Sequence, residues 1–193
     1  MTKTVESRHA AGTKFLICGL FLVLALIDTF FKVKDYDMVK LTISAIGRTQ
    51  PLWFFLWGVI TSVTVLLNLF FICGELQIKT PLVYLMIINC SLSFMLPTIY
   101  IGESPFSLVI HGAGVVIFGI LGYGTLIYCM IDYSIKNKSK ETTAYFYMMS
   151  AVLTAAAVSY AVFGFNGVVE LILLTGAEAI MLIFNAVAFC KSR

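Results

Sequence analysis

Eight polar residues lie within or beside long apolar stretches of this chain, and their side chains could bind a ligand or take part in catalysis. They are Asp28, Ser44, Arg48, Glu103, His111, Asn166, Glu170 and Glu178. A carboxylate near the centre of a bilayer is costly unless it is protonated, paired or hydrated, so such residues face the interior of a helix bundle. Glu178 is the deepest of the eight when depth is counted along its helix.

Two kinds of reaction chemistry are compatible with these residue types. Ser44 could act as a nucleophile with His111 as its base, which would make the protein a membrane-embedded hydrolase or transferase. Alternatively, Asp28, His111 and Glu170 could hold a metal ion, although three separate segments give no spacing signature. The sequence therefore does not decide which of these two sets would be catalytic.

The same residues can also be explained without a reaction. A pocket that includes Asp28, His111 and Glu170 could bind a small molecule or a lipid, with Glu178 as a proton site. Asn166 is well placed to cap the last helix, and Glu170 would then lie in its first turn, where the helix dipole favours a carboxylate. Asp28 and Glu103 could be hydrated or paired with loop lysines, and Asn68 or Asn89 could hydrogen-bond Glu178.

The elements that position these residues can be predicted from composition. Hydrophobic residues make up 60% of the 193 residues and charged residues only 12%, which is more apolar surface than a soluble domain of this size can bury. Stretches of about 18 or more apolar residues indicate membrane-spanning helices. We expect six spans, at about 13–31, 52–76, 81–102, 106–131, 144–163 and 166–190.

Basic residues predict how these helices cross the membrane. With the N-terminus inside, the inner segments hold nine of the thirteen Lys and Arg residues, and basic residues favour the cytoplasmic side. Both termini are therefore expected in the cytoplasm, and the predicted site faces outward. The net charge of +3 needs no nucleic-acid partner, because membrane orientation accounts for it.

The outer segment 33–51 has the pattern of a short helix lying in the membrane interface. Its apolar residues recur at helical spacing, at Met38, Leu41, Ala45 and Ile46. Gly47 is expected to end this helix and Pro51 to begin the next span. The segment could cover a pocket, with Arg48 binding an anion, or it could rest on the lipid surface.

Cofactor signatures are lacking in the sequence. The chain has two histidines, and one of them, His9, lies in the inner tail, which argues against haem. The glycines between Gly112 and Gly124 follow no strand, so they match no dinucleotide fingerprint, and neither nicotinamide nor flavin is expected. These glycines are typical of close contact between helices.

Three short motifs carry a family resemblance. They are Thr42–Gly47, His111-Gly112 followed by Phe118, and Asn166-Gly-Val-Val-Glu170. With these motifs the chain resembles the six-span bacterial membrane proteins of the domain-of-unknown-function family 998, which are distantly similar to Frag and DRAM proteins. The resemblance covers nearly the whole chain and implies a single six-helix bundle with Ser44, His111 and Glu170 as shared positions. It implies no activity.

The sequence therefore predicts an all-α, multi-pass protein of the cell membrane, with membrane lipid as one partner. The first functional hypothesis is an outward-facing polar pocket that binds or transports a small molecule or lipid. The alternatives are the hydrolase or metalloenzyme described above, and an accessory or scaffold subunit whose partner is another membrane protein or a second copy of this chain.

Overall fold

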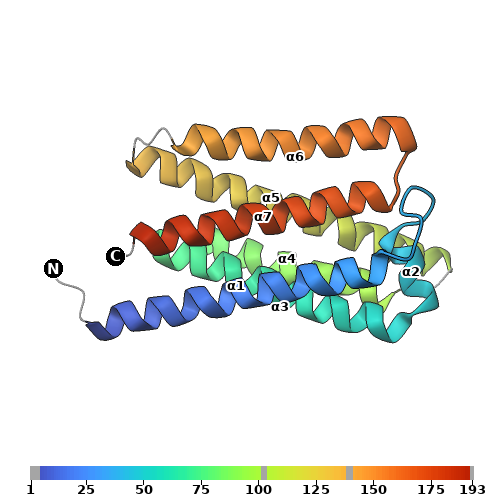
Figure 1. Cartoon of the computed structure of the whole chain (residues 1–193), viewed down its shortest axis with the longest axis horizontal. Helices are drawn as coiled ribbons and strands as arrows, with labels where there is room; N and C mark the ends of the chain where they lie inside the picture. Colours follow the sequence, from blue (N-terminus) through green and yellow to red (C-terminus); the bar gives the residue numbers. More distant parts are fainter. Residues whose placement is uncertain (1–4, 101–103, 138–140, 192–193) are drawn as a thin grey trace.

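The computed structural model describes residues 5–100, 104–137 and 141–191, and all secondary structure in these ranges is helical. In chain order the helices are α1 (Val5–Val33), α2 (Ile43–Thr49), α3 (Pro51–Glu75), α4 (Pro81–Ile99), α5 (Pro105–Asn137), α6 (Glu141–Phe163) and α7 (Gly167–Lys191) (Figure 1). Six of them are long and apolar enough to cross a membrane. The expected fold class, an all-α bundle of six membrane-spanning helices, is confirmed.

Proline residues begin several of these helices. Pro51, Pro81 and Pro105 are the first residues of α3, α4 and α5. Proline suits a helix start, because it has no N–H to leave unpaired and its φ angle is already helical. Two helices extend beyond the expected spans: α1 begins at Val5, and α5 continues to Asn137, where an Asp132–Lys136 ion pair of 2.7 Å supports the last turns.

The short second helix differs from its sequence pattern. It covers Ile43–Thr49, so Met38 and Leu41 lie before it, and Gly47 is inside it instead of ending it. Thr42 caps its start, because the Thr42 hydroxyl accepts the Ala45 N–H at 3.0 Å. Met38 and Leu41 are kept out of the helix because their carbonyl groups bind α7, as described below.

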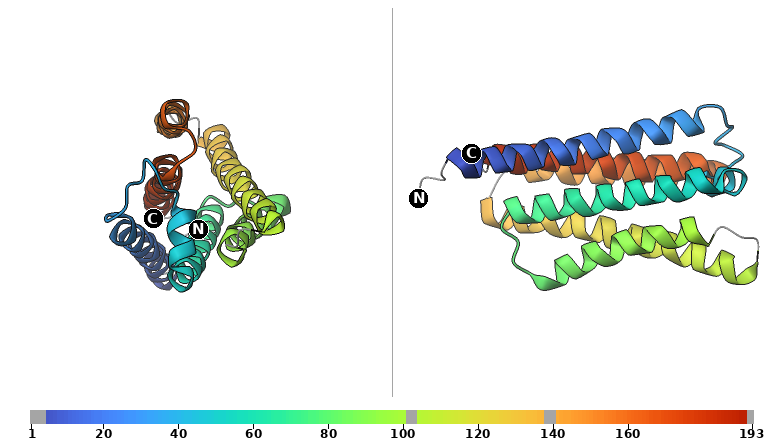
Figure 2. Two further views of the ribbon diagram at one scale, coloured as in Figure 1. Left: turned by 90° about the vertical axis from the view of Figure 1, so that its right-hand side faces the viewer. Right: turned by 90° about the horizontal axis from the view of Figure 1, so that it is seen from below.

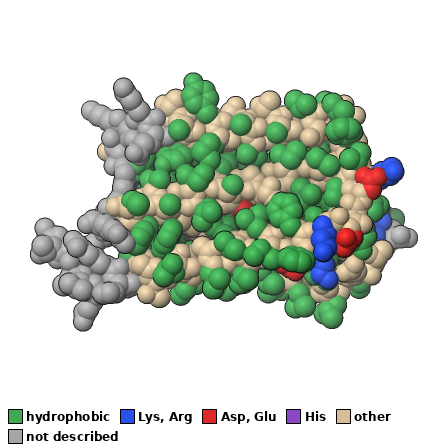
Figure 3. Space-filling model, viewed as in Figure 1, with side chains coloured by type: hydrophobic (Ala, Val, Ile, Leu, Met, Phe, Trp, Pro, Cys, Tyr) green, Lys and Arg blue, Asp and Glu red, His purple; other side chains and the backbone are tan. Residues whose placement is uncertain are grey.

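The long helices form one bundle with α2 across one end. α1 begins and α7 ends at the opposite end (Figure 1). α4 packs along both α3 and α5, while α6 stands at the periphery against α7 and α5 (Figure 2). On the face shown in Figure 3, hydrophobic side chains cover the flank, and most visible charged side chains gather at the α2 end. This is the surface expected of a protein surrounded by lipid.

Buried apolar side chains form two main clusters along the bundle. The cluster near α2 contains Ile46, Phe54, Trp57, Phe94 and Leu174. The larger cluster lies toward the opposite end and includes Ile72, Cys129, Met130, Tyr133 and Phe184. The candidate site residues Ser44, His111 and Glu170 lie near the cluster at the α2 end.

Candidate functional site

The first turn of α7 holds the segment that precedes α2. The Gly167 N–H donates to the Leu41 carbonyl at 2.8 Å, and the Val168 N–H donates to the Met38 carbonyl at 3.2 Å. These bonds use N–H groups that the start of a helix cannot satisfy internally. The connection between α1 and α2 is therefore fixed by backbone bonds to the last helix of the chain.

Asn166 strengthens the same junction and caps α7. Its Oδ1 accepts the N–H groups of Val168 at 3.1 Å and Val169 at 3.2 Å, and its Nδ2 donates to the Val39 carbonyl at 3.2 Å. These bonds are those of the N-cap expected from the sequence, and they also tie the connection to α7.

An exposed ion pair closes the turn before α2. Lys40 Nζ lies 2.9 Å from an Asp37 carboxylate oxygen. The hydrogen bond from the Lys40 ammonium lowers the pKa of Asp37, and the same bond raises the pKa of Lys40. Because both side chains are exposed, the pair adds little to stability.

Ser44 and His111 meet at the α2 end. Ser44 Oγ lies 2.8 Å from His111 Nε2, and His111 Nδ1 lies 3.0 Å from the Pro97 carbonyl oxygen. A carbonyl can only accept, so in the neutral imidazole the proton is on Nδ1, and Nε2 accepts the Ser44 O–H. Pro97 lies in the last turn of α4, where a carbonyl has lost its helical partner and is free for this bond.

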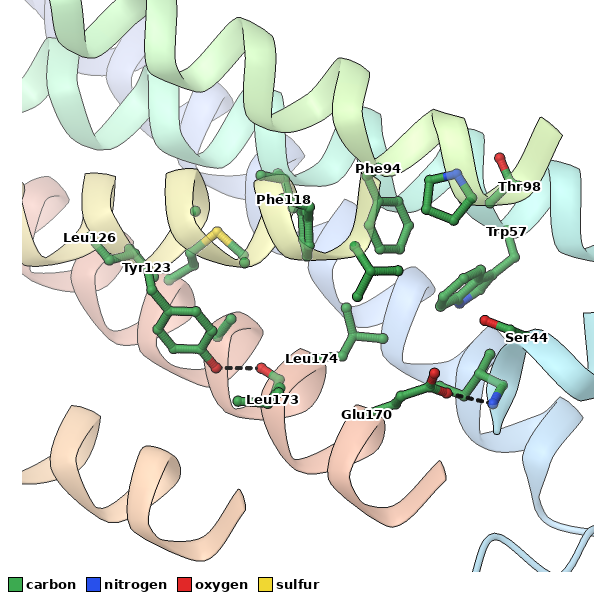
Figure 4. Close-up of a pocket in the computed structure, with 18 of the residues that line it drawn as sticks. Ser44, Trp57, Phe94, Thr98, Phe118, Tyr123, Leu126, Glu170, Leu173 and Leu174 are labelled. Carbon is green, nitrogen blue, oxygen red and sulfur yellow. Dashed lines mark hydrogen bonds between the residues drawn. The ribbon is translucent and has the colours of Figure 1, made fainter. Parts of the chain in front are cut away.

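Glu170 joins α7 to the beginning of α2. Its Oε2 accepts the Ile43 N–H at 2.5 Å, a bond between an acid side chain and the first helical N–H of α2. Its other oxygen, Oε1, makes no hydrogen bond to another residue in the described part of the chain. In Figure 4 the Glu170 side chain lies beside Ser44, facing the space between α7 and the helices opposite.

A cavity of about 130 Å³ begins at Ser44 and Glu170 and runs between α3, α4, α5 and α7. Trp57, Phe94 and Phe118 form one wall (Figure 4). The ring centroids of Trp57 and Phe94 are 5.2 Å apart, and those of Phe94 and Phe118 are 4.4 Å apart. The remaining lining is mostly aliphatic: Ile43, Phe54, Val65, Leu69, Pro97, Thr98, Val115, Gly119, Gly122, Tyr123, Leu126, Phe165, Leu173, Leu174, Ala177 and Met181.

Tyr123 connects the two sides of the cavity. Its hydroxyl donates to the Leu173 carbonyl at 2.6 Å and so links α5 to α7 (Figure 4). Beyond Leu126 and Met181, the interior is occupied by the larger apolar cluster. The cavity is therefore polar at the α2 end and apolar along its length.

The structure does not assemble the predicted metal site. Trp53 Nε1 donates to Asp28 Oδ2 at 3.2 Å, while His111 is engaged by Ser44 and Pro97, and Glu170 by Ile43. No group of three histidine, cysteine or carboxylate side chains that could hold a metal occurs among the described residues. Asp28, His111 and Glu170 do not form such a group, because their side chains serve different helix junctions.

Two other predicted site residues are elsewhere, and one lies outside the described ranges. Arg48, in the last turn of α2, is not among the cavity-lining residues, and neither is Glu178. Glu103 falls within 101–103, outside the described residues.

Glu178 is fully buried, and neither carboxylate oxygen has a hydrogen-bond partner within the described chain. The expected partners were wrong. Asn68 Nδ2 donates to the carbonyls of Thr64 and Cys18 and its Oδ1 accepts from Asn185, whereas Asn89 donates to its own helix at Leu85.

Several functional groups could not be identified from the sequence. Ser44, His111 and Glu170 were candidates by residue type, but the Pro97 carbonyl and the aromatic wall carry no sequence signal distinct from ordinary core residues. Tyr123 is the exception, because a tyrosine deep in an apolar span needs a partner for its hydroxyl.

No family model, curated protein or solved structure matches this chain. The resemblance to the six-span family described above therefore stays a prediction.

Proposed function

We propose that this protein binds an amphiphilic membrane molecule, either a small molecule or a lipid, whose apolar part fills the cavity and whose polar part lies at Ser44 and Glu170. The observation that carries this proposal is the polarity of the cavity, which has hydrogen-bonding groups at the α2 end and an aromatic and aliphatic wall below. A ligand pocket of this kind uses apolar walls for packing and a few polar groups for orientation.

Binding is favoured over transport by the packing beneath the cavity. Tyr133, Tyr145 and Phe184 pack against one another there, with centroids 6.4 Å apart for the two tyrosines and 4.7 Å for Tyr145 and Phe184. A solute passing through would have to displace this packed interior, which is costly. The arrangement is that of a site reached from one end.

Gly119 offers a direct test of the proposal. It lines the cavity on α5, and a Cβ built there has no neighbour within 4 Å. Gly119→Leu should therefore fill the cavity without displacing another helix. Gly19→Leu on α1 is a matched control, because Gly19 also has open space and is not a lining residue.

We expect native mass spectrometry of the gently extracted protein to show the added mass of a bound small molecule or lipid. Gly119→Leu should reduce its occupancy at a given ligand concentration by about tenfold, since overpacking a site costs about 1–3 kcal/mol. Gly19→Leu should retain the added mass. Equal occupancy in both variants would contradict the proposal and favour the accessory or scaffold alternative.

The Ser44–His111 hydrogen bond supports a second candidate function, acyl transfer. Ser44 Oγ would add to an ester carbonyl while His111 Nε2 takes the hydroxyl proton, and that proton would then pass to the departing alcohol. Water would release the acyl group from Ser44. This candidate ranks second because the Glu170 carboxylate at the same mouth would oppose the developing oxyanion.

A fluorophosphonate probe tests this second candidate, because it labels activated serine hydroxyls covalently. Labelling should occur at Ser44 and disappear in Ser44→Ala, while Ser107→Ala, which removes an exposed hydroxyl on α5, should leave it unchanged. A protein that binds amphiphiles but takes up no probe would show that Ser44 serves binding alone.

A further inference from the structure

The cavity walls hold four side-chain donors, and the protein itself uses all of them. Trp57 Nε1 donates to Thr29 at 2.8 Å and Thr98 Oγ1 donates to the Met95 carbonyl at 2.8 Å. The Tyr123 hydroxyl is bound to Leu173, and the Ser44 hydroxyl is bound to His111. Among the described lining residues, no side-chain donor therefore remains for a ligand while Glu170 is ionised.

The acceptors, by contrast, remain available. Glu170 Oε1 has no protein partner within the described residues, and the oxygens of Ser44 and Thr98 keep lone pairs after donating their protons. A head group that can only accept hydrogen bonds would find no partner among these side chains, and an anionic head would also be repelled by Glu170. The mouth is thus suited to a head group that donates hydrogen bonds.

The dimensions of the cavity limit the apolar part of the ligand. The cavity lining on α7 runs from Glu170 to Met181, about 16 Å at the helical rise per residue. This is close to the depth of one leaflet, about half of the roughly 30 Å hydrocarbon core. A volume of about 130 Å³ holds roughly ten water-sized groups, enough for one hydrocarbon chain and too little for two.

We infer that the ligand is a single-chain amphiphile whose head is a hydrogen-bond donor, a hydroxyl or an amine, with a chain of roughly ten carbons in the cavity. This inference rests on the proposed binding function and adds the chemical class of the ligand. Glu170 and Ser44 select the head, and the aromatic wall receives the chain.

Trp57 provides the measurement, because it lines the cavity and the chain has two tryptophans. In Trp53→Phe, emission comes from Trp57 alone, and bromine quenches a tryptophan that it contacts. The probes are 6-bromoundecan-1-ol, 6-bromoundecylamine, 6-bromoundecanoic acid and 6-bromoundecane, each added to the protein in phosphatidylcholine nanodiscs, so that the bromine lies partway along the chain at the aromatic wall. The matched control carries Trp53→Phe, Trp57→Phe and Phe30→Trp, so that its single tryptophan is at an exposed position of α1 outside the cavity lining and reports quenching from the surrounding lipid.

Saturable quenching of Trp57 is expected with the alcohol or the amine at concentrations at least about tenfold lower than with the acid or the bare bromide, a difference of about 1.4 kcal/mol. Quenching by the amine at lower concentrations than the alcohol would indicate that its ammonium group pairs with an ionised Glu170. Quenching by the alcohol at lower concentrations than the amine would indicate a neutral ligand. Unbrominated primary alcohols from hexanol to hexadecanol, used as competitors, should show an optimum at intermediate length.

Glu170→Gln tests the selection of the head. The glutamine oxygen can still accept the Ile43 N–H, while its amide nitrogen brings a donor to the mouth. The preference for the alcohol over the acid should shrink by at least about tenfold. Glu75→Gln, at the far end of α3, should leave the preference unchanged, and Ser44→Ala provides a second variant that removes an acceptor.

The failures are distinguishable. Equal saturable quenching by all four probes, or a preference for the acid, would overturn the donor-head inference and leave the proposed binding function intact. Quenching of Trp57 no stronger than that of the control tryptophan at position 30 with every probe would overturn both.

Discussion

Glu178 is a carboxyl group in a packed interface without a hydrogen bond from the described part of the chain. Asn185 lies two turns further along α7 on the same face and donates to Asn68 of α3. Thr61 precedes Asn68 by the same seven residues, and its buried hydroxyl also lacks a partner within the described chain. This register places Thr61 at the level of Glu178 and makes a polar seam between α3 and α7.

Removing the Glu178 carboxyl should stabilise the protein. Glu178→Met fills a similar volume without a polar group, and relieving an unpartnered buried acid is worth about 1–3 kcal/mol. We expect a higher midpoint of thermal unfolding in matched detergent. Glu75→Met, at the last residue of α3, should change it little. A lower midpoint for Glu178→Met would mean that a water, ion or proton partner holds Glu178 in the native protein.

The site residues differ in how far their chemistry could be predicted. An acid or histidine in an apolar span is conspicuous, and for this reason His111 and Glu170 were candidates. Ser44 lies in segment 33–51, outside the predicted spans, and was a candidate by its residue type and by the motif Thr42–Gly47. The partner that binds each of them depends on helix packing, and the partners of His111 and Glu170 include backbone groups at Pro97 and Ile43. Every residue has such backbone groups, so the sequence cannot single out these two.

At the scale of elements, the junction between α7 and the α1–α2 connection determines where α2 lies. Gly167 permits this junction, because a Cβ there would overlap Met38 Cε and the Leu41 carbonyl oxygen. The Leu41 carbonyl is also the acceptor of the Gly167 N–H. The close approach and the hydrogen bond therefore depend on the same residue.

Gly167→Ala should separate the connection from α7. We expect a loss of about 1–3 kcal/mol in unfolding free energy, because the overlap includes a backbone oxygen that cannot move aside cheaply. Amphiphile binding should weaken as well, since Ser44 and Ile43 come directly after the displaced segment. Gly74→Ala is the control, as a Cβ there has no neighbour within 4 Å. Thermal unfolding and Trp57 quenching measure the two effects, and unchanged values for both would contradict this account of the junction.

The helices differ in how well their sequences predicted them. Long apolar runs and initial prolines indicated the six spans, because a lipid environment requires internally bonded backbone. In segment 33–51, helical spacing from Met38 to Ile46 suggested one continuous helix. Backbone bonds from α7 to Met38 and Leu41 replaced the helical bonds that this pattern anticipated. Tertiary contacts of this kind override a short periodic pattern.

At the scale of the whole molecule, the number of spans could be predicted from hydropathy, but which helices pack against one another could not. Gly114 illustrates the reason: a Cβ there would lie 2.6 Å from Pro97 Cδ and 2.8 Å from the Ser93 carbonyl, so α5 lies unusually close to α4. Gly119, five residues later, faces open space. The glycine-rich stretch predicted close contact between helices, and it could not indicate which glycine faces a helix and which a cavity. The cytoplasmic position of both termini stays a prediction from the distribution of basic residues.

The hydrogen bonds between the start of α7 and Met38 and Leu41 have a consequence for biosynthesis. During synthesis α1, α2 and α3 leave the ribosome first, and α7 leaves it last. Until α7 is inserted, the carbonyls of Met38 and Leu41 lack their N–H donors from α7, and the Ile43 N–H lacks the Glu170 carboxylate. The hydrogen bonds around Ile43 and Glu170 are therefore completed only when α7 has been made, and a nascent chain truncated before α7 would present an unfinished α2 end to the proteases that survey the membrane.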